Sequence, residues 1–394
     1  MASYPKVILK QGKESAIRRF HPWLFSGAIK RTEGSVSEGD IVELFSSSNE
    51  YLATGHYQEG SIAVKLFSFQ QEEINYDFWR NKLKNAYELR TKLSLTESTF
   101  TNAYRLVFSE GDELPGLIID YYNGVCVIAS SSAGIDRIKP QLVDTLKEIY
   151  GEKLKAVYDK SIELTRHASR VTRNDFLYGN NNPVTITETG HKFLVDIERG
   201  QKTGFFLDQR SNRMFAQFYG KEKKVLNAFC YSGAFSVYAL KGGAVIVHSV
   251  DSSRQAIEWT EENITLNRID KAYHKSIVSD IRKYLAETDE TYDMIILDPP
   301  AFAKTHTVSH NALQAYRSIN AQAMKKLNRN GLLFTFSCSQ AISRELFQSA
   351  IMNAGLEAGR EVKILHHLSQ GPDHPVSIYH PEGEYLKGMI LCII

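Results

Sequence analysis

Met294-Ile-Ile-Leu-Asp-Pro-Pro-Ala-Phe-Ala-Lys304 and Gly331-Leu-Leu-Phe-Thr-Phe-Ser-Cys-Ser339 are two apolar runs that end abruptly on polar residues. Each run is typical of a buried strand, with Asp298 or Cys338 at the point where the strand ends. Ligands bind beyond the carboxyl ends of parallel strands, so we expect the Asp298 carboxylate and the Cys338 thiol to share one crevice. A carboxylate beside a thiol is typical of a catalytic site.

Strand-like and helix-like segments alternate from about residue 184 to the end of the chain, which predicts an α/β fold with a doubly wound parallel sheet. The other predicted strands of this sheet are 225–227, 245–251, 276–280, 362–365 and 389–394. The predicted helices are 234–240, 254–266, 312–327 and 345–354.

A turn with a single glycine follows the first of these strands, in Phe229-Cys-Tyr-Ser-Gly-Ala-Phe235. The turn lacks the G-x-G-x-x-G pattern that a pyrophosphate needs, so a dinucleotide fits poorly. Asp251, eighteen positions after Gly233, is placed to hold ribose hydroxyls, and Asp280 is placed to accept from an adenine amino group. Each acid alone is more often a helix cap or a solvated loop residue, but the ordered set favours S-adenosylmethionine.

Cys338 suggests which atom receives the methyl group. Carbon 5 of a pyrimidine becomes nucleophilic when a thiolate adds to carbon 6, and a carboxylate at ring nitrogen 3 stabilises that adduct. We assign the first role to Cys338 and the second to Asp298, against the alternative that Cys338 is an inert buried residue. Cys126, Cys230 and Cys392 are interpreted as packing residues.

The first 183 residues predict two further domains. Several short strand-like segments within residues 1–72 predict a small β-barrel, and residues 73–183 predict a middle α/β domain with Asp77 as the cap of its first helix. The third domain is 184–394.

Charge is unevenly distributed, although the net charge is only +2. Residues 1–31 contain seven basic residues and one acidic residue, which predicts a phosphate-facing surface that includes Lys13, Arg18 and Arg19. Arg166 and Arg170, with Arg173, share one face of a predicted helix that could also meet phosphates. A merely solvated charged face is the alternative in both places.

The four cysteines show no C-x-x-C spacing, so neither a zinc site nor a disulfide framework is predicted, and we expect no metal. The start of the chain lacks a signal-peptide core, and no apolar run is long enough to span a membrane. We therefore expect a cytoplasmic protein without a membrane partner.

The chain resembles the bacterial 23S ribosomal RNA cytosine-5 methyltransferases with an N-terminal PUA domain, of the ribosomal RNA large subunit methyltransferase I type. The resemblance covers essentially the whole chain. It rests on Asp298-Pro-Pro and on the segments 21–27, 200–210, 227–235, 336–340, 373–375 and 381–388.

The resemblance implies a PUA domain, a middle α/β domain and a class I, Rossmann-like methyltransferase domain. It implies ribosomal RNA as partner and Cys338 as the nucleophile. The residues that it places around S-adenosylmethionine are Gln201, Phe229, Tyr231, Ser232, Gly233, Asp251, Asp280 and Asp298. Ala301 stands where many RNA cytosine-5 methyltransferases carry a second cysteine that releases the product, so release needs another base. His374 is a candidate for that base, with a structural role as the alternative.

The leading hypothesis is therefore an S-adenosylmethionine-dependent RNA methyltransferase that forms 5-methylcytosine. One alternative is a ribosomal RNA guanine N-methyltransferase, in which the cysteine is incidental. Another is a non-catalytic RNA-binding factor of ribosome assembly. The sequence leaves the oligomeric state open, with a homodimer as one option.

Overall fold

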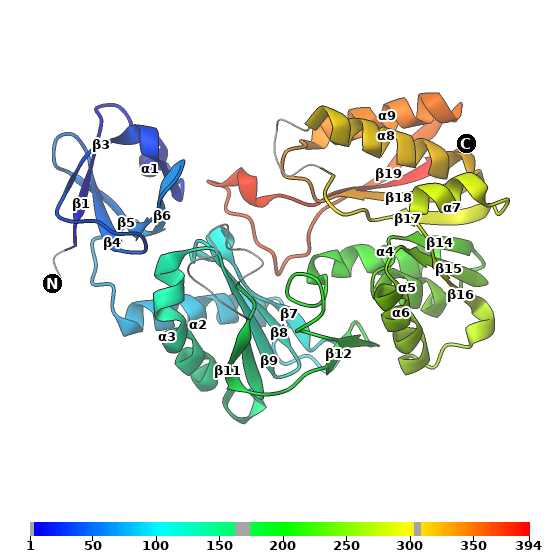
Figure 1. Ribbon diagram of the computed structural model, residues 1–394, viewed down its shortest axis with the longest axis horizontal. Coiled ribbons are helices and arrows are strands. Elements are labelled where there is room, and N and C mark those ends of the chain that lie inside the picture. The colour runs from blue at the N-terminus through cyan, green and yellow to red at the C-terminus, as the bar shows by residue number, and fades with distance from the viewer. Residues whose placement is uncertain (1–3, 162–173, 303–308) are drawn as a thin grey trace. The chain divides into compact units, whose positions relative to one another are not determined.

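The computed structural model describes residues 4–161, 174–302 and 309–394 (Figure 1). The chain divides into two compact units. The first comprises Met1–Thr187, Val195–Leu207 and Pro372–Gly383, and the second comprises Glu188–Leu194, Asp208–Gly371 and Glu384–Ile394. Each unit is described by itself.

The first unit begins with a six-stranded sheet in the order β2-β6-β5-β4-β1-β3. Its elements are β1 (Lys6–Leu9), α1 (Ser15–Arg18), β2 (Trp23–Phe25), β3 (Ile29–Glu33), β4 (Ile41–Phe45), β5 (Tyr51–Tyr57) and β6 (Ile62–Ser68). Apolar side chains from alternate strand positions, such as Val7 and Leu9, close one small core with Leu24, Val42 and Leu66.

The first unit also contains a five-stranded sheet in the order β11-β10-β9-β8-β7. Its elements are α2 (Tyr76–Lys92), β7 (Ala103–Phe108), β8 (Leu117–Tyr122), β9 (Val125–Ser130), α3 (Ala133–Tyr150), β10 (Ala156–Asp159) and β11 (Asp175–Gly179). β8 and β9 form an antiparallel hairpin, which Asn123 and Gly124 turn with φ values of 46° and 97°.

The predicted cap of α2 is wrong by two positions. Asn75, not Asp77, caps the helix, because its side chain accepts from the Phe78 amide at 3.0 Å. Asp77 lies in the first turn, where its charge still favours the positive end of the helix dipole.

The second unit is built on a seven-stranded sheet in the order β16-β15-β14-β17-β18-β20-β19. Its strands are β14 (Lys224–Ala228), β15 (Ile246–Asp251), β16 (His274–Val278), β17 (Tyr292–Leu297), β18 (Leu327–Ser337), β19 (Val362–Leu368) and β20 (Lys387–Ile393). Its helices are α4 (Arg210–Tyr219), α5 (Ala234–Lys241), α6 (Arg254–Leu266), α7 (Ile281–Glu287), α8 (Ser309–Lys325) and α9 (Arg344–Ala358). β12 (Val184–Glu188) and β13 (His191–Val195) form a separate two-stranded sheet.

The predicted α/β fold is confirmed, with one correction to the sheet. The strands β14 to β18 are parallel, as expected. β20, however, lies between β18 and β19 and runs antiparallel to both. The sheet is therefore mixed, because the last strand returns from the opposite direction.

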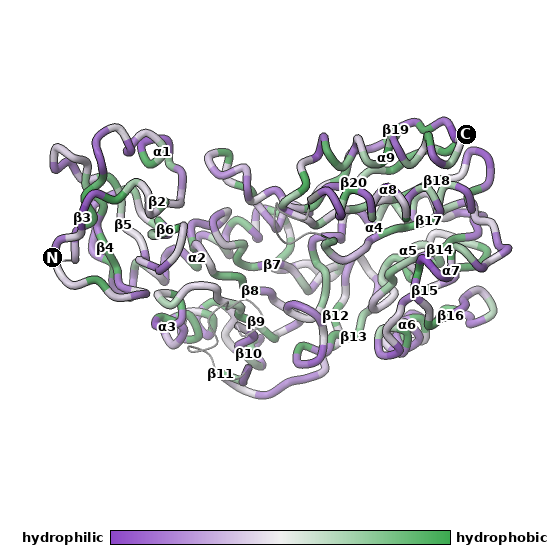
Figure 2. Tube along the Cα trace, turned by 45° about the horizontal axis from the view of Figure 1, so that its top comes forward, coloured by the Kyte–Doolittle hydropathy of each residue, from purple (hydrophilic) through white to green (hydrophobic). Residues whose placement is uncertain are grey.

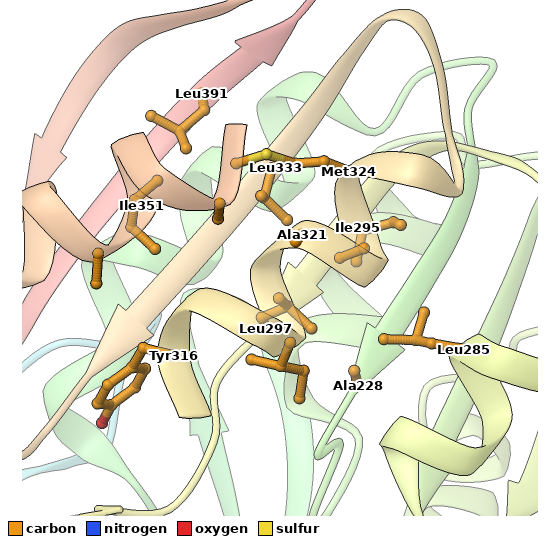
Figure 3. Close-up of a cluster of buried hydrophobic side chains, with 14 of the residues drawn as sticks. Ala228, Leu285, Ile295, Leu297, Tyr316, Ala321, Met324, Leu333, Ile351 and Leu391 are labelled. Carbon is orange, nitrogen blue, oxygen red and sulfur yellow. The ribbon is translucent and has the colours of Figure 1, made fainter. Parts of the chain in front are cut away.

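The main core of the second unit lies under helices α8 and α9, where Leu297, Leu333, Ile351 and Leu391 pack together (Figure 3). Helices such as α3 and α6 mix hydrophilic and hydrophobic residues along their length (Figure 2), which is typical of helices with one buried face. Among the described residues, we find no helix whose length and hydropathy would allow it to cross a membrane.

Candidate functional site

Five parallel strands end at one edge of the seven-stranded sheet. Leu297 of β17 pairs with Ala228 of β14 on one side and with Thr335 of β18 on the other. Asp298 therefore follows the central strand of the three, and Cys338 follows its neighbour at the same edge. The predicted adjacency of these two strands is confirmed.

The turn after β14 has an unusual backbone. Phe229, Tyr231 and Gly233 all have positive φ, at 58°, 48° and 72°. Residues other than glycine rarely adopt this backbone conformation, which costs them about 1–3 kcal/mol each. Such strained backbone gathers at ligand-binding sites, and it presents the peptide groups of this turn at the strand edge.

Helix α6 holds the turn from behind. A Cβ on Gly233 would lie 2.5 Å from Cγ2 of Thr260, so only glycine fits at this approach. The Thr260 hydroxyl lies 2.9 Å from the carbonyl oxygen of Tyr231, and Nδ2 of Asn263 donates to the carbonyl of Ser232 at 2.9 Å. Side chains of the helix therefore fix two consecutive peptide groups of the turn.

Thr260 and Asn263 were not among the residues predicted from the sequence, although the sequence carries a signal for them. Both side chains are fully buried, and they lie on the same helix face as Ile257 and Ile264. Polar residues at helical spacing on an apolar face need partners when they are buried. In a helix that follows a predicted ligand turn, the backbone of that turn is the natural partner.

Asp251 ends β15 beside this turn. Its Oδ2 accepts from the Tyr231 amide at 3.0 Å, and its Oδ1 accepts from the Ser253 amide at 2.9 Å. The side chain is half-buried. Each carboxylate oxygen retains a second lone pair, so the residue can still accept from two hydroxyl groups. Two such acceptor positions suit the two hydroxyl groups of a ribose, and the contact of Asp251 with the cofactor stays a prediction.

Asp280 has a structural function of its own. It caps α7, because its Oδ1 accepts from the amides of Arg282 and Lys283 at 2.9 and 3.0 Å. Asp280 lies at the end of β16, two strands from β14 in the same sheet. The contact with adenine stays a prediction.

Cys338 lies in a segment that is held by a buried tyrosine. The Tyr316 hydroxyl is 2.9 Å from Oγ of Ser337 and 3.1 Å from Oγ of Ser339, so it contacts both neighbours of Cys338. Burial raises the pKa of Tyr316, so the phenol remains protonated and can donate. The Tyr316 hydroxyl oxygen points away from the aliphatic core around Leu297 (Figure 3).

The other cysteines differ from Cys338 in their surroundings. Cys126 and Cys230 are buried, and burial raises the pKa of both thiols. Cys392 is half-buried, but it pairs with Leu332 in the middle of β18, away from the edge where Cys338 lies. The packing interpretation of these three residues agrees with the structure.

The basic N-terminal segment is exposed in the first unit. Lys13, Arg18 and Arg19 all lie on the surface. Arg18, however, forms a two-pronged ion pair with Glu50, with contacts of 2.5 and 3.0 Å. The pair neutralises part of the predicted positive charge, so Lys13 and Arg19 are the stronger candidates for phosphate contacts.

Three of the predicted site residues are not tested by this geometry. Arg166 and Arg170 fall outside the described residues. Gln201 belongs to the first unit and stays a predicted cofactor residue.

One group of metal-ligand types occurs among the residues that the structure describes. It consists of His21, His380 and Glu382 in the first unit. Nδ1 of His21 lies 3.2 Å from the Trp23 amide nitrogen and 3.3 Å from the Trp23 carbonyl oxygen, so the Trp23 backbone contacts Nδ1 in either tautomer and leaves Nε2 for other groups. That nitrogen faces Glu382 at 3.7 Å. His21 and Glu382 are therefore within reach of a direct polar contact.

His374 was a candidate for the base that releases the product. It is buried in the first unit, where its Nδ1 lies 3.1 Å from Asp373 and its ring lies 5.3 Å from that of Phe108. These contacts favour the structural alternative.

Two segments of the chain match known protein families. Residues 7–69 match a PUA-like domain, and residues 114–377 match an S-adenosylmethionine-dependent methyltransferase. Two solved structures share the fold over 98% of this chain and 99% of their own, each at 24% identity. One is described as a SAM-dependent methyltransferase from Streptococcus mutans, with a TM-score of 0.84, and the other is a methyltransferase complexed with SAH, with a TM-score of 0.85.

Curated relatives match over the full length. The ribosomal RNA large subunit methyltransferase I of Tolumonas auensis is 39% identical over 98% of both chains. The protein of the same name from Pseudoalteromonas atlantica is 38% identical over 99% of both chains. The chain therefore belongs to the ribosomal RNA large subunit methyltransferase I family of S-adenosylmethionine-dependent methyltransferases.

Proposed function

We propose that the protein methylates carbon 5 of a cytosine in large-subunit ribosomal RNA, and that Cys338 acts as the nucleophile that bonds covalently to the base. The observation that carries this proposal is the position of Cys338. It is half-buried, it follows a strand next to the one that ends in Asp298, and it shares the sheet edge with the strained turn. The names of the relatives supply the class of RNA.

Cys338 and Asp298 divide the chemistry between them. The thiolate adds to carbon 6 of the ring, and the electron pair of the double bond moves toward carbon 5. Asp298 contacts ring nitrogen 3 and stabilises the electron-rich ring of the adduct. The proline pair after Asp298 ends the strand and restricts the backbone next to the carboxyl group.

Six residues of the second unit would hold the nucleoside of the cofactor. Asp251 would accept from the ribose hydroxyls, and Asp280 from the adenine amino group. The turn residues Phe229, Tyr231, Ser232 and Gly233 would bring their backbone against the ligand. Bound S-adenosylmethionine supplies the methyl group as an electrophilic sulfonium.

The first unit offers a surface that suits single-stranded RNA. Phe20 and Tyr379 are about half exposed, and their rings lie 5.4 Å apart. Arg19 is the chain neighbour of Phe20, and Lys13 belongs to the same basic segment. Exposed aromatic rings stack on bases, while basic side chains neutralise phosphates. A steep loss of affinity with salt is therefore expected.

Nucleoside mass spectrometry tests the reaction. Ribosomal RNA from a deletion strain should lack one 5-methylcytosine, which returns with the wild-type gene and not with Cys338→Ala. Cys392→Ala is the matched control, because it removes a half-buried thiol at the other end of the same strand pair. Full 5-methylcytosine with Cys338→Ala would refute the covalent mechanism.

The same experiment separates the alternatives. Loss of a methylguanine with 5-methylcytosine intact would indicate a guanine N-methyltransferase. An unchanged nucleoside profile, together with no binding of S-adenosylmethionine in calorimetry, would indicate a non-catalytic assembly factor. The cytoplasmic location, the homodimer and the domain boundaries at residues 72 and 183 remain predictions.

A further inference from the structure

A buried lysine lies beside Cys338. Lys387 is the first residue of β20, and it pairs with Ser337 of β18 in the antiparallel register. Its Nζ donates to the carbonyl oxygen of Ser339 at 2.8 Å. The side chain is only 5% exposed. The ammonium thus lies against the peptide that follows Cys338, and the residues on both sides of the nucleophile contact this lysine or pair with it.

A buried ammonium needs a negative partner, because leaving water disfavours the charged form. Burial lowers the pKa of Lys387, and a thiolate at Cys338 opposes this effect by raising it. The charges of Arg344 and Glu384 shift the pKa of Lys387 in opposite directions. The charge on sulfur is therefore the largest favourable influence on the ammonium among these groups.

This influence changes during the reaction of the proposed function. While Cys338 is a thiolate, its charge favours the ammonium form of Lys387. Once sulfur is bonded to carbon 6, it is a neutral thioether, and the favourable charge disappears. Burial is then no longer opposed by the charge on sulfur, and the lysine loses its proton more readily. A neutral amine thus arises at the step in which the ring needs a base.

Resting on the proposed function, we propose that Lys387 is the base that removes the carbon-5 proton, and that its ammonium pairs with the Cys338 thiolate before the addition. Ala301 leaves the chain without a second cysteine at the position after the prolines. Lys387 takes the role for which the sequence offered only His374 as a candidate.

The proton balance closes over one turnover. After the adduct has formed, the Lys387 ammonium gives one proton to water. The amine then takes the proton from the methylated carbon 5, the electrons of that C–H bond restore the ring double bond, and the S–C6 bond breaks with its pair on sulfur. The thiolate and the ammonium are regenerated. One proton has gone to water, as the replacement of hydrogen by a methyl group from a sulfonium requires.

Stereochemistry places the base on the side of the thiol. If the thiolate attacks one face of the ring and the methyl group arrives on the other, the carbon-5 hydrogen is left on the face of the sulfur. A base for that hydrogen must therefore lie close to Cys338, as Lys387 does through Ser339.

Two substitutions separate the two roles. Lys387→Arg keeps a positive charge for the thiolate but cannot act as a base, because a guanidinium does not lose its proton in proteins. With ordinary cytosine RNA and S-adenosylmethionine, this variant should accumulate a methylated, denaturation-resistant protein–RNA adduct, while turnover falls at least ~100-fold. Lys387→Met removes both roles, so it should form adduct slowly as well.

RNA that contains 5-azacytosine provides the control for the addition step. This base has no carbon-5 hydrogen to remove, so Lys387→Arg should be trapped about as fast as the wild type, and Lys387→Met more slowly. Alkylation of the Cys338 peptide by iodoacetamide, in the absence of RNA and cofactor, should slow roughly 10-fold or more in Lys387→Met, because the thiol loses its cationic neighbour. Thermal melting and cofactor binding establish that each variant is folded.

The outcomes distinguish the two proposals. Wild-type turnover by Lys387→Arg without adduct would overturn the assignment of the base, and unchanged alkylation in Lys387→Met would overturn the ion pair. Failure of wild-type protein to be trapped by 5-azacytosine RNA would instead overturn the covalent function itself. If Lys387→Arg does not fold, Lys387→Gln, which also lacks a base, replaces it. Accumulation of the adduct by Lys387→Gln would support Lys387 as the base, and wild-type turnover without adduct would overturn it.

Discussion

Gly233→Ala probes the turn that we assign to the cofactor. The added Cβ would lie 2.5 Å from Cγ2 and 2.9 Å from Oγ1 of Thr260, closer than unbonded atoms allow. Overpacking of this kind costs about 1–3 kcal/mol. The φ of +72° adds about 1–2 kcal/mol for a residue with a side chain. We therefore expect a destabilisation of about 2–5 kcal/mol.

Gly359→Ala is the matched control. Gly359 has a φ of +65°, and nothing lies within 4 Å of its added Cβ. This variant should show the backbone cost alone, about 1–2 kcal/mol. The difference between the two variants therefore isolates the contact with Thr260.

Thermal melting and calorimetric titration with S-adenosylmethionine measure the effects. Gly233→Ala should lower the melting temperature by roughly 4–20 °C and weaken cofactor binding at least ~10-fold, while Gly359→Ala leaves the affinity unchanged. Thr260→Ser removes the methyl group that clashes, so the double variant should recover part of both losses. Equal melting temperatures and equal affinities for the two glycine variants would refute the reasoning.

Three further predictions concern buried groups. Glu188→Gln should destabilise the protein by about 3–5 kcal/mol in thermal melting, because it removes the charge of the carboxylate whose two oxygens accept from the buried Arg213 guanidinium at 2.8 Å. Iodoacetamide at pH 7.5 should leave Cys126 and Cys230 unmodified in folded protein, as peptide mass spectrometry would show, because their raised pKa keeps them as buried thiols. Burial lowers the pKa of His56 to about 3, so below about pH 6.5 the unfolded state binds a proton that the folded state does not. Between pH 7 and pH 5 the free energy of unfolding of the wild type should therefore fall by about 2 kcal/mol relative to that of His56→Phe, as denaturant titrations would measure. Parallel pH profiles of the two proteins would contradict this.

Local pattern was sufficient for much of the fold. The helix predicted at 254–266 has the bounds of α6, because Ser253 caps it and its apolar residues recur at helical spacing. The strands before Asp298 and Cys338 were also predicted, since each is a continuous apolar run. The error at α2 arose between Asn75 and Asp77, two capping residue types only two positions apart, which sequence alone does not separate.

Long-range contacts set the limit of prediction. The positive φ values of Phe229 and Tyr231 have no signal in their residue types, because neither is glycine, and contacts from α6 hold that backbone. Lys387 could not be connected with Cys338, because the two are far apart in sequence and meet only through the pairing of β18 with β20. The sequence predicted both C-terminal strands but carried no sign of their order.

The direction of β20 explains why a lysine can lie beside the nucleophile. A parallel strand brings its last residues to the edge where the ligand-binding turns lie, as β17 does with Asp298. An antiparallel strand brings its first residue to that edge, and in β20 this residue is Lys387. Cys338 therefore lies between Asp298, at the end of one neighbouring strand, and Lys387, the proposed base, at the start of the other. In this proposal β20 contributes Lys387 to the site as well as a strand to the sheet. A substitution that shifts the β18–β20 register should therefore reduce methyl transfer more than it reduces the stability of the domain.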